Sequence, residues 1–187
     1  MALATVAMLS GCGSKSTETT DTAEFADSTN EAAADNTASD SASVATEDDA
    51  EFAVNAANGG MAEVALSKIA EEKATDPKVK EFAKQMITDH SKANDELKTL
   101  AASKNITLPS APNEEKQKAA SNLGSKSGAD FDKAYIAQMK KDHDQTVKLF
   151  EDAQKDVKDA ELKAFIDKTL PVIKAHAEHV KSLDKTK

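Results

Sequence analysis

The sequence predicts an all-α protein whose folded part is a bundle of four long helices. Hydrophobic residues make up 39% of the 187 residues, but aromatic residues make up only 4%. Ala, Lys, Asp and Glu dominate, whereas Gly (6) and Pro (4) are few, and this composition suits helices better than sheets. Four stretches also repeat apolar residues at steps of three and four, the period of a helix face that packs on a core.

The first two predicted helices span residues 49–73 and 77–104. We expect Asp48 to be the N-cap of the first, with Glu51 at its third position. Asp76 and Pro77 give the second an N-cap followed by proline in the first turn. The apolar face of the first helix holds Phe52, Ala56, Gly59, Glu63, Leu66 and Ala70, and that of the second holds Val79, Phe82, Met86, His90, Ala93, Leu97 and Leu100.

The third and fourth predicted helices span residues 128–154 and 159–185. Their apolar faces hold, respectively, Phe131, Tyr135, Met139, His143, Thr146 and Phe150, and Leu162, Ile166, Thr169, Ile173, His176, Val180 and Leu183. The connection 105–127 is long enough to cross the bundle from end to end and has room for one short helix. Long crossovers are typical of ferritin-like bundles. The predicted fold is therefore a ferritin-like four-helix bundle, residues 49–187, with a long crossover between helices two and three.

A disordered acidic tether, residues 13–48, is expected to precede this domain. It contains nine acidic residues and one lysine, a net charge of −8 out of −9 for the chain, which leaves about −1 for residues 49–187. Its large apolar residues are too few to form a core. Because the domain has no basic excess and the chain has no arginine, nucleic acid is not expected as a partner.

Residues 1–12 are interpreted as a lipoprotein signal peptide. Leu9-Ser10-Gly11-Cys12 resembles a bacterial lipobox, in which the cysteine thiol receives a diacylglycerol. We expect lipidation of Cys12 and anchoring to a membrane of the bacterial cell envelope, the outer membrane facing the periplasm, through acyl chains rather than a spanning helix. No Lys or Arg precedes Cys12, which is unusual for a signal peptide, and the alternative is a chance match in a cytosolic protein.

Each predicted helix carries one ionisable residue on its apolar face, near its middle: Glu63, His90, His143 and His176. Residues at the middle of each helix share one level of the bundle whichever way the helices point. A buried carboxylate or imidazole is costly unless something compensates it. The layer is therefore either a site for one transition metal (Zn, Cu or Fe) or a structural polar network that fixes helix register.

Several neighbouring residues have two interpretations. Asp89 and Asp142 precede two of the histidines but point about 100° away on a helix, as surface acids or as hydrogen-bond partners of metal ligands. Met86 and Met139 lie one turn before His90 and His143, where a thioether could bind copper or fill the core. A further histidine, His179, lies three residues after His176 and could form a second metal-binding pair with it, but it is expected to face solvent. The only cysteine is Cys12, so the domain has no thiolate ligand.

The domain resembles a bacterial envelope family of unknown function with a ferritin-like helical fold, often labelled as outer membrane proteins or lipoproteins. The resemblance rests on Glu63 and on the segments "FAKQMITDH", "FDKAYIAQMKKDH" and "LKAFIDKTLPVIKAH". It implies the fold and an envelope location but no activity. The Glu-x-x-His pattern of di-iron bundles is absent, because Ile87, Lys140 and Ile173 occupy the positions three before the histidines.

The functional hypothesis is a lipid-anchored envelope protein with a candidate metal-binding layer at mid-bundle. The alternative is a non-catalytic interaction or stress-protection module whose polar layer is structural. The sequence contains no Gly-x-Ser-x-Gly motif and no glycine-rich phosphate loop, so a hydrolase is not predicted, and it names no protein partner.

Overall fold

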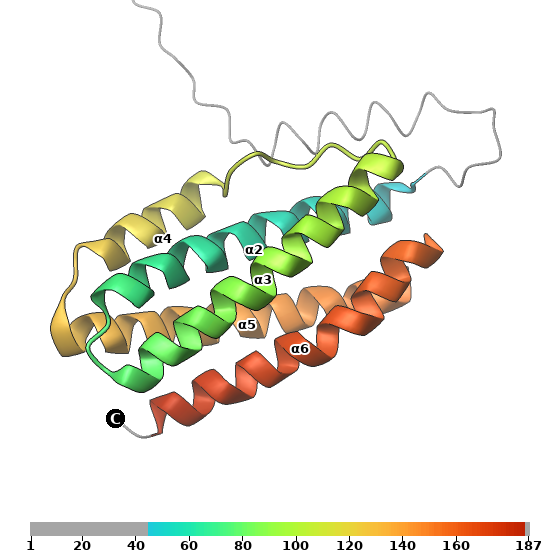
Figure 1. Ribbon diagram of the computed structural model, residues 1–187. Helices are drawn as coiled ribbons and strands as arrows, with labels where there is room; N and C mark the ends of the chain where they lie inside the picture. The colour runs from blue at the N-terminus through green and yellow to red at the C-terminus, as the bar shows by residue number, and fades with distance from the viewer. Residues whose placement is uncertain (1–44, 186–187) are drawn as a thin grey trace, which may run out of the picture.

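The computed structural model describes residues 45–185, which form five helices and no strand (Figure 1). The helices are α2 (Glu47–Lys73), α3 (Pro77–Ser103), α4 (Glu114–Gly124), α5 (Gly128–Asp156) and α6 (Ala160–Asp184). The all-α prediction is confirmed. The predicted bundle of four helices is not confirmed as a count, because the connection after α3, in which one short helix was expected to fit, contains α4, a helix of 11 residues. The predicted signal peptide and Cys12 lie outside the described residues, as does nearly all of the predicted tether.

The four long helices form two pairs, α2 with α3 and α5 with α6, and α4 packs against α2 and α5 (Figure 1). The connection that contains α4 runs the length of the bundle. Ile106 packs in the apolar cluster at one end, and Leu123 packs in the cluster at the other end. Consequently α3 and α5 run in the same direction, which is the arrangement that a long crossover permits in ferritin-like bundles.

Side-chain caps set the start of most helices. Asp76 Oδ1 accepts a hydrogen bond from Lys78 N (2.8 Å), as expected, and Asp159 caps α6. The prediction for α2 is wrong, because its N-cap is Thr46 rather than Asp48. Thr46 N donates to Asp49 Oδ2 (2.8 Å) while Asp49 N donates to Thr46 Oγ1 (3.3 Å). This reciprocal capping box satisfies two backbone donors at once.

Two buried aspartates tie the helix pairs together at opposite ends of the bundle. Asp49 Oδ1, at the start of α2, accepts hydrogen bonds from the backbone N–H groups of Lys158 (2.9 Å) and Asp159 (3.1 Å) in the α5–α6 turn. Asp132 of α5 accepts from the backbone N–H groups of Thr75 (2.9 Å) and Asp76 in the α2–α3 turn. Hydrogen bonds to a buried charge are strong, so these contacts fix the register of one pair against the other.

The apolar core is divided into two clusters, one at each end of the bundle. On every long helix the change from one cluster to the other falls around the ionisable residue of the predicted layer: Glu63 between Ala57 and Leu66, His90 between Met86 and Leu97, His143 between Met139 and Phe150, and His176 between Ile173 and Val180. The expectation that these four residues share one level is confirmed. No helix within residues 45–185 is both long and apolar enough to cross a membrane.

Candidate metal centre

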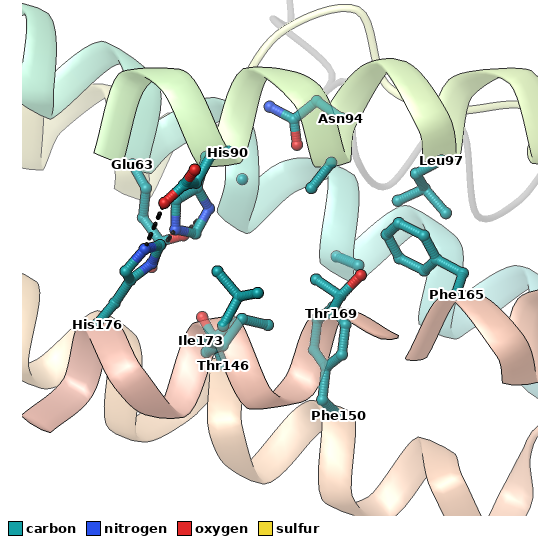
Figure 2. A pocket seen from close by; sticks show the side chains of 15 residues that line it. Glu63, His90, Asn94, Leu97, Thr146, Phe150, Phe165, Thr169, Ile173 and His176 are labelled. Carbon is teal, nitrogen blue, oxygen red and sulfur yellow. Dashed lines mark hydrogen bonds and ion pairs between the residues drawn. The ribbon is translucent and has the colours of Figure 1, made fainter. Parts of the chain in front are cut away.

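Four side chains from four different helices meet at the boundary between the two apolar clusters. Glu63 of α2, His90 of α3, His143 of α5 and His176 of α6 are all buried, with exposed fractions of 1%, 6%, 0% and 1%. Figure 2 shows Glu63, His90 and His176 close together at one end of a pocket. One nitrogen from each of the three histidines lies within 4.8 Å of the other two, so the sequence-predicted histidines converge.

His90 lies between a carboxylate and another imidazole. Its Nδ1 is 3.0 Å from Glu63 Oε2, and its Nε2 is 3.3 Å from His176 Nδ1. A carboxylate oxygen only accepts hydrogen bonds and repels a lone pair. The proton of a neutral His90 therefore lies on Nδ1, which leaves the lone pair of Nε2 facing His176.

The other two histidines follow the same rule. His176 Nε2 lies 2.9 Å from Asp89 Oδ2, so its proton faces that carboxylate and its Nδ1 is the acceptor. His143 Nδ1 lies 2.9 Å from the backbone carbonyl of Met139, which can only accept. The opposite nitrogen of His143, Nε2, is fully buried and has no hydrogen-bond partner. Each imidazole thus has one nitrogen used by an oxygen acceptor and one nitrogen left over.

The three remaining nitrogens, His90 Nε2, His143 Nε2 and His176 Nδ1, are lone-pair donors in the neutral protein. Two of them face each other at 3.3 Å, an arrangement that needs either a shared proton or a cation between them. In metal sites a ligating histidine almost always donates its other N–H to a carboxylate or a carbonyl. Glu63, Asp89 and the Met139 carbonyl occupy those positions here.

The electrostatics of the layer favour a positive charge. Burial is the largest influence on Glu63 and raises its pKa, but attraction to His90, His143 and Lys116 together outweighs it and lowers that pKa to about 2. Glu63 Oε2 lies 3.0 Å from His90 Nδ1, so the contact becomes an ion pair when His90 is protonated. A carboxylate that stays ionised inside the core attracts a cation or a protonated imidazole.

Two histidine pKa values move in opposite directions. Burial is the largest influence on His90 and lowers its pKa, yet attraction to Glu63 and Asp89 outweighs it, so the pKa of His90 lies above 6.5. Burial lowers the pKa of His176 below 6.5, and the hydrogen bond to Asp89 does not offset it. A proton in the metal-free layer therefore binds His90 in preference to His176.

The neighbouring acids have different roles. Asp89 contacts His176 of α6 rather than the adjacent His90, a pairing between helices that sequence analysis missed because no pattern along one helix reveals it. Asp142 is buried but pairs with Lys116 Nζ (2.7 Å) and accepts from Gln138 Nε2 (2.8 Å). It therefore holds α4 against α5 rather than orienting His143.

The remaining candidates lie outside the three-histidine cluster. Met86 and Met139 are fully buried in one of the apolar clusters, in agreement with a core-filling role. His179, the fourth histidine of the chain, is partly exposed. Its Nδ1 is 3.3 Å from Gln85 Oε1, and its ring lies edge-on to Phe82 with 5.0 Å between ring centroids.

Residues 16–183 match the model of DUF4142, a domain of unknown function. The chain belongs to this family. The match extends N-terminally into the segment interpreted as a tether, and it supports the resemblance to a helical domain of unknown function. The envelope location of this DUF4142 chain stays a prediction. No curated protein matches the sequence.

Two solved structures share the fold of this DUF4142 chain. One is a DUF305 fragment from Deinococcus radiodurans, with 10% identity and a TM-score of 0.68, covering 76% of this chain and 99% of that one. The other is CopM in its Cu(II)-bound form, with 18% identity and a TM-score of 0.63, covering 73% of this chain and 95% of that one. At these identities the likeness establishes the fold alone.

The pKa shifts predict how Glu63 stabilises the metal-free protein. The pKa of Glu63 falls from 4.5 to about 2 on folding, so its contribution is complete above pH 4.5 and is lost as the pH falls through 2. The pKa of His90 rises above 6.5, so its contribution is complete below pH 6.5 and is lost as the pH rises through the folded value. Glu63→Gln should therefore lower the free energy of unfolding most between about pH 4.5 and 6.5, by about 3 kcal/mol.

Urea unfolding of the chelator-treated protein at pH values below, within and above that window measures this difference. Glu71→Gln, on the exposed face of the same helix, is the matched control and should show no such window. A Glu63→Gln effect that is equal at all three pH values would contradict the proposed ion pair.

Proposed function

We propose that this chain is a metal-binding protein that holds one copper ion between His90, His143 and His176. The observation that carries the proposal is the convergence of three buried imidazole nitrogens, none of which faces an oxygen acceptor. The Nε2 of His143 gives the most direct support, because a buried polar atom without a hydrogen-bond partner costs free energy, and a bound metal ion would remove that cost.

The spacing of the nitrogens fits a metal ion. Two ligands at a metal–nitrogen distance of 2.0–2.1 Å on a tetrahedral ion lie about 3.3 Å apart. His90 Nε2 and His176 Nδ1 are 3.3 Å apart, and the three histidines each have a nitrogen within 4.8 Å of a nitrogen of the other two. A cation placed among them would turn a repulsive contact between lone pairs into three bonds. Copper, when bound, would supply a redox-active Lewis acid at mid-bundle.

Glu63 takes a different role from the one that the sequence indicated. The sequence analysis placed it among the metal ligands, but its Oε2 lies against His90 Nδ1, on the side of the ring away from the shared point. We therefore assign Glu63 as a positioning residue for His90, as Asp89 is for His176. Such contacts fix the orientation of a ligand and raise its basicity.

The donor set is compatible with copper. Imidazole nitrogen suits Zn, Cu, Fe and Ni, and Cu(II) has the highest affinity of these for a given nitrogen site. A carboxylate-rich site would favour iron, but here the carboxylates contact imidazole N–H groups. The similarity in fold to Cu(II)-bound CopM adds support of a weaker kind, since it concerns a protein of low identity.

The metal-binding proposal is tested by comparing two histidines of the same helix. His176→Ala removes a proposed ligand, whereas His179→Ala removes the histidine three residues later, outside the cluster. Both should be made in the full chain with Cys12→Ser, so that the single thiol does not bind copper. We expect near one copper per chain in the parent and in His179→Ala, and an affinity weakened at least tenfold in His176→Ala, since even the loss of a ligand's hydrogen-bond partner costs about 10–100-fold.

Elemental analysis after equilibration with one equivalent of copper and competition with a chelator measure these affinities. Equal copper affinity in His176→Ala and the parent would contradict the proposal. The histidine layer would then be a structural network that fixes helix register.

We further propose that the protein is attached to a bacterial envelope membrane by acyl chains on Cys12. The support is the lipobox-like Leu9-Ser10-Gly11-Cys12, which lies outside the described residues. Expression in a bacterial host fed a radiolabelled fatty acid should give a labelled, membrane-associated protein, and Cys12→Ser should give neither property. Label retained in Cys12→Ser, or parent protein free of label, would contradict the anchor.

A further inference from the structure

A cavity of about 30 Å³ lies beside the histidine layer and is lined by residues of α2, α3, α5 and α6 (Figure 2). Glu63, His90 and His176 form its inner end. Away from that end its walls are mostly carbon, from side chains such as Leu97, Phe150, Phe165 and Ile173. The uncharged polar side chains in the lining are Asn94, Thr146 and Thr169. The volume is sufficient for one water-sized molecule or slightly more, so the candidate metal centre adjoins a small space that protein atoms do not fill.

Small residues create this space where large ones would close it. Ala56 and Gly60 of α2 and Ala93 of α3 line the cavity, although the other core positions on these helices include Phe52 and Leu66. Gly60 also allows a close approach, because a Cβ atom there would lie 2.1 Å from Asn94 Oδ1. A leucine on the α2 or α3 wall would occupy the cavity, as leucine and phenylalanine do elsewhere in the core.

The cavity lies close to the protein surface. A shallow hollow of about 130 Å³ between α3 and α6 shares four lining residues with it, Asp89, Ala93, Thr169 and Val172. The side chain of Asp89 is 36% exposed, and Val172, at 41%, is the one large hydrophobic residue among those described that is clearly exposed. The shared wall thus extends from the protein surface to His176.

We propose that this cavity is the binding site for a small uncharged diatomic ligand of the metal. The inference rests on the proposed copper site. Three imidazole ligands leave a coordination position free for an exogenous molecule, and the cavity adjoins the centre on the side where His90 and His176 meet. Apolar walls disfavour charged or strongly hydrogen-bonding ligands, and the volume limits the ligand to about two heavy atoms.

Carbon monoxide binding to the copper(I)-loaded protein tests this inference. The full chain with Cys12→Ser is loaded with one equivalent of copper(I), and the C–O stretch is followed by infrared spectroscopy during a titration with carbon monoxide. Ala93→Leu should fill the cavity and weaken carbon monoxide binding at least about tenfold while copper content stays near one per chain. Ala134→Leu, a partly buried alanine of α5 that does not line the cavity, should bind carbon monoxide as the parent does.

Each outcome separates this inference from the proposed function. A parent protein that fails to bind copper defeats both. A copper-loaded parent that shows no C–O stretch, or equal carbon monoxide affinity in Ala93→Leu and Ala134→Leu, overturns the cavity site and leaves the copper site standing. If Ala93→Leu does not fold, Ala56→Val fills the cavity from α2 with a smaller side chain, and the same two readings apply.

Discussion

The contact between a ring nitrogen of His90 and a ring nitrogen of His176 is the constraint on which the rest of the bundle depends. Two imidazole nitrogens lie 3.3 Å apart, while the opposite nitrogen of each ring is held by a carboxylate. A buried contact between two lone pairs is unfavourable, so the layer requires a proton or a cation at its centre. Burying four ionisable groups costs free energy. The apolar clusters on either side of the layer must offset that cost, and each contains large buried side chains.

The layer depends on helix register, and register is fixed far from the layer. An α-helix rises about 1.5 Å per residue, so a slip of one turn between the helix pairs would move a histidine by about 5.4 Å and separate the nitrogens. Asp49 and Asp132 oppose such a slip from opposite ends of the bundle, because each binds the turn of the other pair. The small residues beside the layer have a separate effect, because they leave a cavity next to the histidine nitrogens.

Periodicity along single helices predicted much of the fold, including the four long helices, the crossover and the shared level of Glu63, His90, His143 and His176. It did not predict the contacts between side chains of different helices. The pairing of Asp89 with His176 depends on how α3 and α6 pack, and the side on which Glu63 meets His90 depends on side-chain orientation. The helix α4 was predicted only as one short helix that the connection could hold, because a short segment shows little periodicity. The Thr46 cap was not predicted because Asp48 is an equally acceptable N-cap.

X-ray absorption spectroscopy of the Cys12→Ser chain loaded with one equivalent of copper(II) tests the central claim most directly, because it reports the atoms bound to the metal. The account predicts a first shell that includes three imidazole nitrogens at about 2.0 Å, with the outer-ring scattering typical of histidine. A shell dominated by carboxylate or backbone oxygen, or one unchanged when His143 is replaced by alanine, would contradict the assignment of the histidine layer as a metal centre.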